Sequence, residues 1–199
     1  NYSSKISSAQ IKSSILLSGL AASGKTIFKE PNESRNHTEK MLSSLGANIQ
    51  SKTLEDGSYK VELGGNPVLR SGNINVPCDP SSAAFLVVAA VICPESKIEL
   101  KNIMINKGRN GLFETLKEMG AKINIFNKKN NGGEETASII AEYSQLKGIT
   151  VPSKRVPSMI DEYPILSIAA SCAEGKTVMD GISELRVKES DRIKIISNG

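Results

Sequence analysis

Two segments near the end of this 199-residue sequence carry charged side chains at spacings that suit acid–base chemistry. In the first, Asp161 and Glu162 are adjacent carboxylates in the first turn of a predicted apolar helix over 158–172. One of them would act as a general base if it pointed into a cleft. Stabilisation of the helix dipole explains the same pair without any catalytic role.

The second segment holds Lys188, Glu189 and Arg192. Lys188 and Arg192 are four residues apart, which would place both cations on one face of a helix that begins near Glu189. Two cations and a carboxylate there suit a substrate with phosphate or carboxylate groups and a proton-transfer step. A solvated, charged helix face is the alternative, and the spacing alone leaves both open.

Three further polar segments begin predicted helices. Ser8 is a natural N-cap for a helix over 9–20. Arg35 precedes a helix over 36–45, where it would form an anion site or lie solvated. Asp79 and the serines after it cap a helix over 81–91.

Residues 19–26 match the phosphate-binding pattern G-x-x-x-x-G-K-T. In a true P-loop a strand leads in and a helix follows. Here a predicted helix leads in and a predicted strand follows, so Gly24 is better interpreted as the turn between them. A P-loop nucleotide hydrolase is therefore a distant alternative.

Composition predicts a soluble globular chain with an aliphatic core. Hydrophobic residues make up 39%, aromatic residues 4%, and there is no Trp. The net charge of +4 comes without a basic arm, which argues against nucleic-acid binding. Cys78, Cys93 and Cys172 show no C-x-x-C spacing and His37 is the only histidine, so no metal site is predicted. Cys93 and Cys172 lie in apolar stretches and are predicted to be core residues.

The sequence contains no signal peptide and no apolar run long enough to span a membrane, which predicts a cytoplasmic protein. It also lacks an initiator Met and ends just after a predicted helix begins. We expect it to be part of a longer protein.

Hydrophobic periodicity predicts the elements that must position these residues. Besides the helices already named, a helix is predicted over 111–119. Strands are predicted over 24–29, 48–52, 58–63, 73–76, 97–100, 122–127, 138–143, 149–151 and 176–179. Residues 44–49 resemble residues 118–123, and residues 24–27 resemble 175–178, which indicates a repeated unit of about 75 residues. Each unit should form a small mixed sheet with helices on one face, and several units must share a core.

Five motifs then occur in a fixed order along the chain. They are SAQ (8–10), SRNHTEKML (34–42), DPSSAAF (79–85), PSMIDEYP (157–164) and ELRVKESDR (184–192). In this order they resemble the EPSP synthase family, over essentially the whole chain. The last two motifs are specific and the others are supporting.

The resemblance implies an α/β (α+β) fold of two domains, each built from three βαβαββ units. Residues 1–76 would belong to the shikimate-3-phosphate-side domain and 77–199 to the domain with the catalytic carboxylates. The family transfers the enolpyruvyl group of phosphoenolpyruvate to the 5-hydroxyl of shikimate 3-phosphate and releases phosphate, in aromatic amino acid biosynthesis. It needs no cofactor or metal. We expect a monomeric cytoplasmic transferase whose partners are these two small molecules, with no nucleic acid or membrane.

Carried over by position, the resemblance assigns shikimate 3-phosphate binding to Ser8, Ala9 and Gln10. Gln10 would also lie near phosphoenolpyruvate. Arg35 would hold the phosphate of shikimate 3-phosphate.

The resemblance assigns the chemistry to the C-terminal motifs. Asp161 would accept the proton of the attacking hydroxyl, and Lys188 would bridge the two substrates. Glu189 would transfer a proton at the methylene carbon, and Arg192 would grip the carboxylate of phosphoenolpyruvate.

Some features depart from the family pattern. The family has a Lys and an Arg-bearing segment before the point where this chain starts, and another Arg after it stops. Cys78 stands where Gly is usual. We therefore expect a chain truncated at both ends and inactive alone. Two alternatives stay open: an inert module that only binds a phosphorylated ligand, and the sister enzyme acting on UDP-N-acetylglucosamine.

Overall fold

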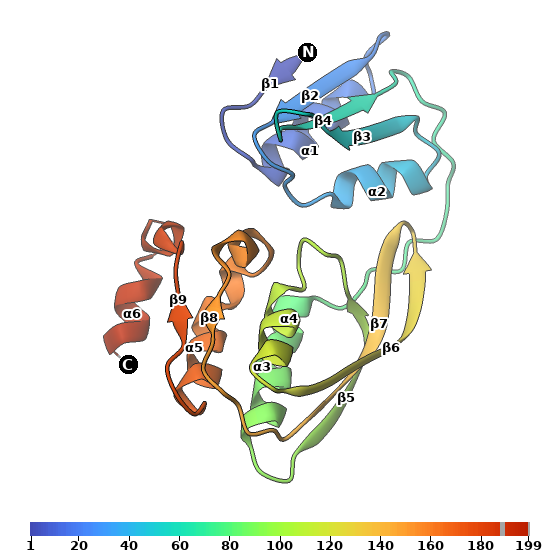
Figure 1. Ribbon diagram of the computed structural model, residues 1–199. Helices are drawn as coiled ribbons and strands as arrows, with labels where there is room; N and C mark the ends of the chain where they lie inside the picture. Colours follow the sequence, from blue (N-terminus) through green and yellow to red (C-terminus); the bar gives the residue numbers. More distant parts are fainter. Residues whose placement is uncertain (188–189, 199) are drawn as a thin grey trace. The chain divides into compact units, whose positions relative to one another are not determined.

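The computed structural model describes residues 1–187 and 190–198, which form two compact units (Figure 1). Unit 1 comprises Asn1–Val76 and Asn130–Glu134. Unit 2 comprises Pro77–Lys129 and Glu135–Gly199.

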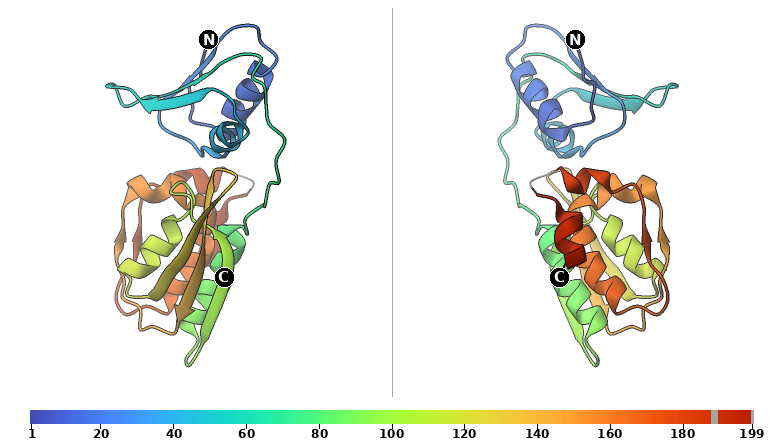
Figure 2. Two further views of the ribbon diagram at one scale, coloured as in Figure 1. Left: turned by 90° about the vertical axis from the view of Figure 1, so that its right-hand side faces the viewer. Right: turned by 90° about the vertical axis from the view of Figure 1, so that its left-hand side faces the viewer.

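Unit 1 contains one four-stranded sheet and two helices. Its elements are β1 (Tyr2–Ser3), α1 (Ala9–Gly19), β2 (Thr26–Glu30), α2 (His37–Ser44), β3 (Ile49–Thr53) and β4 (Tyr59–Leu63). The strand order is β1-β2-β4-β3, with β1 parallel to β2 and the other pairs antiparallel. Both helices lie on one face of this sheet (Figure 2). The predicted mixed sheet with helices on one face is therefore confirmed for unit 1.

The alternation of side chains along β4 explains why the helices pack on that face. Tyr59, Val61 and Leu63 are buried, and they meet Leu16 of α1 and Leu42 of α2 in one cluster. Successive side chains of a strand point to opposite faces, so the residues between them face the other side. Burying each of these large apolar side chains contributes about 1.5–3 kcal/mol.

Unit 2 packs its long helices against a three-stranded sheet. Its elements are α3 (Pro80–Ile92), β5 (Lys97–Met104), α4 (Gly111–Glu118), β6 (Lys122–Asn131), β7 (Glu134–Glu142), β8 (Thr150–Val151), the 3₁₀ helices η1 (Ser153–Ser158) and η2 (Ile160–Glu162), α5 (Tyr163–Ser171), β9 (Val178–Met179), η3 (Ser183–Arg186) and α6 (Arg192–Asn198). The sheet order is β5-β7-β6, and β8 pairs with β9 in parallel. The core is mainly aliphatic, as the composition predicts, and contains Val87, Leu116, Ile139 and Leu166.

The repeat is visible in the backbone where α2 and α4 end. Gly46 and Gly120, at matching positions of the two repeats, have φ of 93° and 97°. The amide after Gly46 donates to the carbonyl of Leu42 at 2.9 Å, and the amide after Gly120 donates to that of Leu116 at 2.9 Å. Both helices thus end in the same glycine-dependent cap. A side chain at either glycine would strain the backbone.

The turn between α1 and β2 does not have the strand–loop–helix order of a P-loop. A helix leads in and a strand follows, as predicted and opposite to a P-loop. The turn is packed tightly, because a Cβ added to Gly65 would collide with the carbonyl oxygens of Ala22 and Gly24. This glycine-rich turn is a packing feature.

Two predicted elements differ in the structure. Residues 73–76, predicted as a strand, lie outside the strands of all three sheets of the described residues, and Ile74 and Val76 are exposed. Their apolar–polar alternation mimics a strand, but no face of it is buried. The predicted helix over 158–172 is instead η1, η2 and α5. Pro157 lies inside η1 and Pro164 in the first turn of α5, and Pro is accepted in the first turn of an α-helix but not in its interior.

The prediction that Cys93 and Cys172 lie in the core is wrong. Both are exposed, and they are the C-cap residues of α3 and α5. Each follows the last apolar turn of its helix, where the chain leaves the core.

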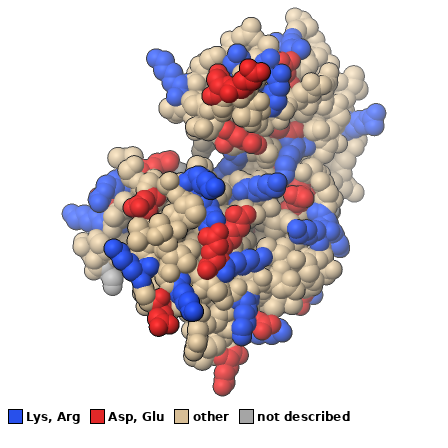
Figure 3. All heavy atoms as spheres, in the orientation of Figure 1, with Lys and Arg blue, Asp and Glu red and all other residues tan. Residues whose placement is uncertain are grey.

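Charged side chains of both signs are interspersed on the face of unit 2 shown in Figure 3. Among the described residues, no helix is both long and apolar enough to cross a membrane. The same residues include no group of three or more His, Cys, Asp or Glu placed to hold a metal ion.

Candidate active site

In unit 1, the start of α1 presents the SAQ motif. Ser8 is the N-cap, as predicted, and its Oγ accepts a hydrogen bond from the Ile11 amide at 3.4 Å. The same hydroxyl donates to Gln10 Oε1 at 3.3 Å. Ser8 and Ala9 are half-buried and Gln10 is exposed, so the motif is accessible at a helix N-terminus. Free backbone N–H groups and the helix dipole favour an anion there.

Arg35 lies just before the second helix of unit 1. It is half-buried and precedes Asn36, the N-cap residue of α2. The Asn36 side chain makes no capping hydrogen bond and donates to Glu33 Oε1 at 3.1 Å instead. A guanidinium beside a helix N-terminus is a suitable binder for phosphate.

The carboxylate of Glu30 joins these two segments. Its Oε2 accepts from the Ser8 amide at 3.2 Å and from Ser34 Oγ at 2.8 Å. Ser34 is the residue before Arg35, so the structure brings the SAQ motif and the Arg35 segment together. Glu30 itself is held by Lys12, with Nζ to Oε1 at 3.0 Å.

Sequence reasoning singled out neither Lys12 nor Glu30. Lys12 falls within the predicted helix over 9–20 and Glu30 just after the predicted strand over 24–29, and neither belongs to a motif. Glu39 completes the cluster, 2.8 Å from Lys12 Nζ. Burial raises the pKa of Glu39 against the opposing effect of the Lys12 ammonium.

In unit 2, the structure brings Asp161 and Arg192 together. Asp161 lies in η2 and Arg192 is the first residue of α6, and Arg192 Nη1 lies 3.2 Å from Asp161 Oδ1. Asp161 keeps 32% of its side chain exposed and Arg192 keeps 17%. The partly exposed carboxylate is placed to act as a general base, and the guanidinium beside it is placed to bind an anionic ligand. Asp161 precedes the regular helix instead of lying in its first turn, which corrects the prediction.

The helix predicted to carry the second charged segment begins later than expected. It starts at Arg192, with Asp191 Oδ1 accepting from the Lys194 amide at 3.0 Å, as an N-cap residue does. Lys188 and Glu189 lie outside the described residues, so their predicted roles stay predictions.

The second carboxylate of the predicted pair, Glu162, has a different environment from Asp161. It is only 4% exposed, and the hydroxyl of Ser81 donates to its Oε1. Arg109 Nη2 in turn donates to Ser81 Oγ at 2.7 Å and to Asp79 Oδ1 at 2.8 Å. The N-terminus of α3 therefore anchors η2 beside Asp161. Sequence reasoning gave no signal for Arg109, because its partners lie 28 and 30 residues away.

Burial would raise the pKa of Asp79, but the hydrogen bonds from Ser82 and Ser81 and the charge of Arg109 together outweigh that effect and lower the pKa. Asp79 Oδ2 accepts from the backbone amide of Ser82 at 2.9 Å, the predicted cap of α3. Asp79 therefore stays charged beside Arg109.

A second arginine fixes the segment that precedes Asp161. Arg155 in η1 makes two hydrogen bonds to Glu118, at 2.8 and 2.5 Å, and a third to Thr115 Oγ1 at 3.0 Å. Bidentate pairs of this kind hold orientation as well as charge. The hydrogen bonds from Arg155 lower the pKa of Glu118.

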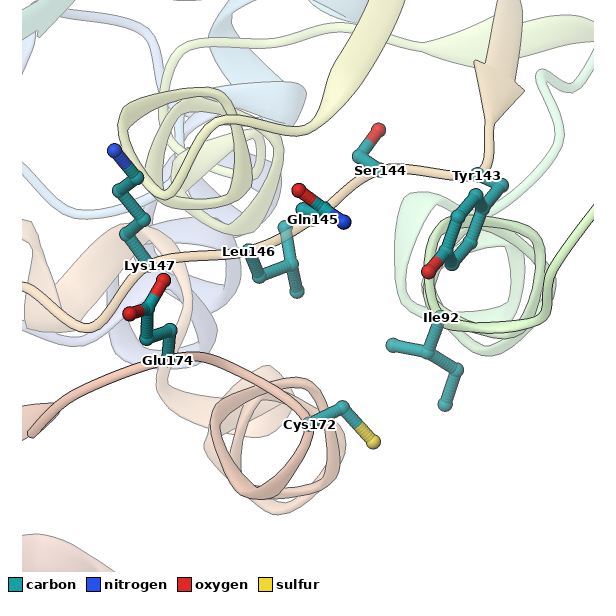
Figure 4. A pocket seen from close by; sticks show the side chains of 8 residues that line it. All are labelled: Ile92, Tyr143, Ser144, Gln145, Leu146, Lys147, Cys172 and Glu174. Carbon is teal, nitrogen blue, oxygen red and sulfur yellow. The ribbon is translucent and has the colours of Figure 1, made fainter.

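A pocket of about 320 Å³ lies elsewhere in unit 2 (Figure 4). It is lined by Ile92, Tyr143, Ser144, Gln145, Leu146, Lys147, Cys172 and Glu174. None of the predicted site residues lines it, so the candidate chemistry does not belong to this pocket.

Unit 1 thus contains two helix N-termini tied to one carboxylate, and unit 2 contains a carboxylate paired with an arginine. The fold of the chain agrees with that of a solved enolpyruvyl transferase. The enolpyruvyl transferase NikO from Streptomyces tendae superimposes with a TM-score of 0.55 over 81% of this chain and 36% of its own, at 20% identity. This likeness shows the enolpyruvyl transferase fold.

Sequence comparison then defines the family. A family model for EPSP synthase (3-phosphoshikimate 1-carboxyvinyltransferase) matches residues 1–198. The 3-phosphoshikimate 1-carboxyvinyltransferases of Bartonella quintana (strain Toulouse) and Chelativorans sp. (strain BNC1) are each 52% identical to the chain, over 198 and 199 residues. EPSP synthase from Acinetobacter baumannii superimposes with a TM-score of 0.92 at 47% identity, over 100% of this chain and 44% of its own. The chain belongs to the EPSP synthase family.

The matches to the Bartonella and Chelativorans relatives include 100% of this chain. They include only 45% and 44% of the length of those relatives. The chain therefore spans less than half the length of the relatives it matches.

Proposed function

We propose that this chain forms part of a 3-phosphoshikimate 1-carboxyvinyltransferase. The reaction would move the enolpyruvyl group of phosphoenolpyruvate to the 5-hydroxyl of shikimate 3-phosphate and release phosphate. The observation that carries the proposal is the family match over residues 1–198. That match favours this reaction over the sister reaction on UDP-N-acetylglucosamine.

Unit 1 would hold shikimate 3-phosphate. Ser8, Ala9 and Gln10 would contact the ligand at the start of α1, and Arg35 would hold its phosphate. Two observations support this assignment: both segments lie at helix N-termini, and both are tied to Glu30. Helix N-termini and a guanidinium together suit a phosphate dianion.

Unit 2 would supply the proton transfers. Asp161 would take the proton of the 5-hydroxyl as that oxygen attacks, and Arg192 would bind the carboxylate of phosphoenolpyruvate. Their ion pair supports this, because it places the carboxylate that would take the proton directly beside the cation that would bind the substrate carboxylate. Lys188 would bridge the substrates, and Glu189 would transfer a proton at the methylene carbon. These two roles rest on the motif alone.

The share of the relatives that this chain covers favours a more limited role for the chain by itself. We propose that it binds shikimate 3-phosphate and does not turn over alone. Residues 1–76 would form part of the shikimate-3-phosphate domain and 77–199 part of the domain with the catalytic carboxylates.

Calorimetric titration of the chain with shikimate 3-phosphate tests the proposal. We expect saturable heat with the wild-type chain and at least about tenfold weaker binding for Arg35→Ala, since a charge-assisted hydrogen bond contributes about 1.5–3 kcal/mol. Asp161→Ala should also weaken binding. ATP is the matched ligand control: no affinity for shikimate 3-phosphate, or equal affinity for ATP, would contradict the proposal.

A further inference from the structure

A cluster of buried charges lies beneath the proposed ligand-binding corner of unit 1. Lys12 in α1 is 0% exposed, Glu30 at the end of β2 is 2% exposed and Glu39 in α2 is 6% exposed. Lys12 Nζ is 3.0 Å from Glu30 Oε1, 2.8 Å from Glu39 Oε1 and 5.1 Å from the centre of the Tyr59 ring. Burying a lysine and two carboxylates is costly unless each finds partners.

The hydrogen bonds of Glu30 reach the proposed binding segments directly. Its Oε2 accepts from the amide of Ser8 at 3.2 Å. Its Oε1 accepts from the amide of Ser34 at 3.0 Å, and both of its oxygens lie 2.8 Å from Ser34 Oγ. One carboxylate therefore binds the residue at the start of the SAQ motif and the residue before Arg35.

Lys12 closes the arrangement. Its Nζ donates to Glu30 Oε1 and, at 3.1 Å, to the backbone oxygen of Ser34. The amide, the hydroxyl and the carbonyl of Ser34 are thus all bonded to the Lys12–Glu30 pair. Glu39 also pairs with this lysine. Among the described residues, however, no hydrogen bond joins Glu39 to Ser8 or Ser34.

We propose that Lys12 and Glu30 are positioning residues that fix Ser8 and Arg35 in the geometry needed to bind shikimate 3-phosphate. The inference rests on the proposed function. Neither residue would contact the ligand. They would act by holding the two backbone segments, in the way that supporting hydrogen bonds keep a binding group within a fraction of an ångström of its place.

The two carboxylates offer a matched pair of variants. Glu30→Gln and Glu39→Gln each replace one carboxyl group beside Lys12 by an amide of similar volume, and each leaves the lysine one carboxyl partner. Only Glu30→Gln turns an NH₂ group toward the amides of Ser8 or Ser34, which can only donate. We expect shikimate 3-phosphate to bind at least about tenfold more weakly to Glu30→Gln and within about twofold of wild type to Glu39→Gln.

Ser34→Ala is a milder variant that should fold even if Glu30→Gln does not, because Ser34 is only half-buried. It removes the hydroxyl that both Glu30 oxygens share, and we expect binding several-fold weaker than wild type. Each titration would be run below the unfolding temperature of the variant, so that the folded protein is measured.

Combining Glu30→Gln with Arg35→Ala separates positioning from general stability. If Glu30 acts through Arg35, the loss of affinity in the double variant is smaller than the product of the two single losses. Equal affinity of wild type, Ser34→Ala and folded Glu30→Gln would overturn the inference while leaving the proposed function intact. No binding by the wild-type chain would overturn both.

Discussion

The hydroxyl of Ser81 is the link between α3 and the segment that carries Asp161, and its removal gives a sharp prediction. Ser81 Oγ donates to the carboxylate of Glu162, which is 4% exposed, and accepts from Arg109 Nη2 at 2.7 Å. Ser81→Ala deprives a buried carboxylate and a guanidinium whose side chain is 15% exposed of one partner each. Hydrogen bonds to charged groups contribute about 1.5–3 kcal/mol.

We therefore expect Ser81→Ala to lower the free energy of unfolding by about 2–3 kcal/mol, which corresponds to a midpoint about 4–12 °C lower for a chain of this size. Urea and thermal unfolding followed by circular dichroism would measure both. Ser82→Ala is the matched control, since Ser82 lies in the same turn, is exposed and keeps its amide bond to Asp79. It loses only a solvent-exposed hydroxyl bond to Asp79, at 2.9 Å, and should cost less than about 1 kcal/mol. Equal losses for the two variants would contradict a stabilising link through the Ser81 hydroxyl.

Three further changes test packing and electrostatics. Gly65→Ala should destabilise unit 1 by more than about 2 kcal/mol because its Cβ collides with backbone oxygens, whereas Gly72→Ala, with no atom within 4 Å, should be neutral in the same unfolding assay. Leu116→Ala should cost about 2–5 kcal/mol in urea unfolding, as the side chain is 0% exposed. Hydrogen bonds from Arg155 lower the pKa of Glu118, so the stabilisation by Glu118 is present above its ordinary pKa of 4.5 and is lost as pH falls through the folded-state value. Glu118→Gln should therefore be less stable than wild type at neutral pH, by less than about 1 kcal/mol at this half-exposed site. The stabilities of the two proteins should become equal in acid, and a difference that does not change with pH would contradict this prediction.

The repeated architecture was predictable because it depends on residues that are close to one another in the sequence. The glycine caps at Gly46 and Gly120 need only the chemistry of a positive φ, and the apolar periods of α1 and α4 need only the helix repeat. The same local logic failed at 73–76, where alternation occurs without a partner strand. It also failed at Cys93 and Cys172, where an apolar neighbourhood continues up to the helix end and the chain then leaves the core.

The candidate site was predictable only in part, for a different reason. Asp161 and Arg192 belong to motifs, so the resemblance named them, and the structure adds that they form an ion pair. Lys12 and Glu30 carry no motif, and their partnership spans 18 residues between a helix and a strand. Only the packing of α1 on β2 shows that this lysine is buried.

Turnover in a chimera would test most directly whether this chain forms part of a 3-phosphoshikimate 1-carboxyvinyltransferase. In this chimera, the present chain would replace the matching segment of the Bartonella quintana enzyme. The assay would follow the release of phosphate from phosphoenolpyruvate in the presence of shikimate 3-phosphate. We predict turnover within about tenfold of the parent enzyme, and a loss of at least about 10²-fold in Asp161→Asn, the magnitude expected when a general base is removed. A folded chimera that binds shikimate 3-phosphate but releases no phosphate, or an Asp161→Asn chimera as active as its parent, would contradict the account.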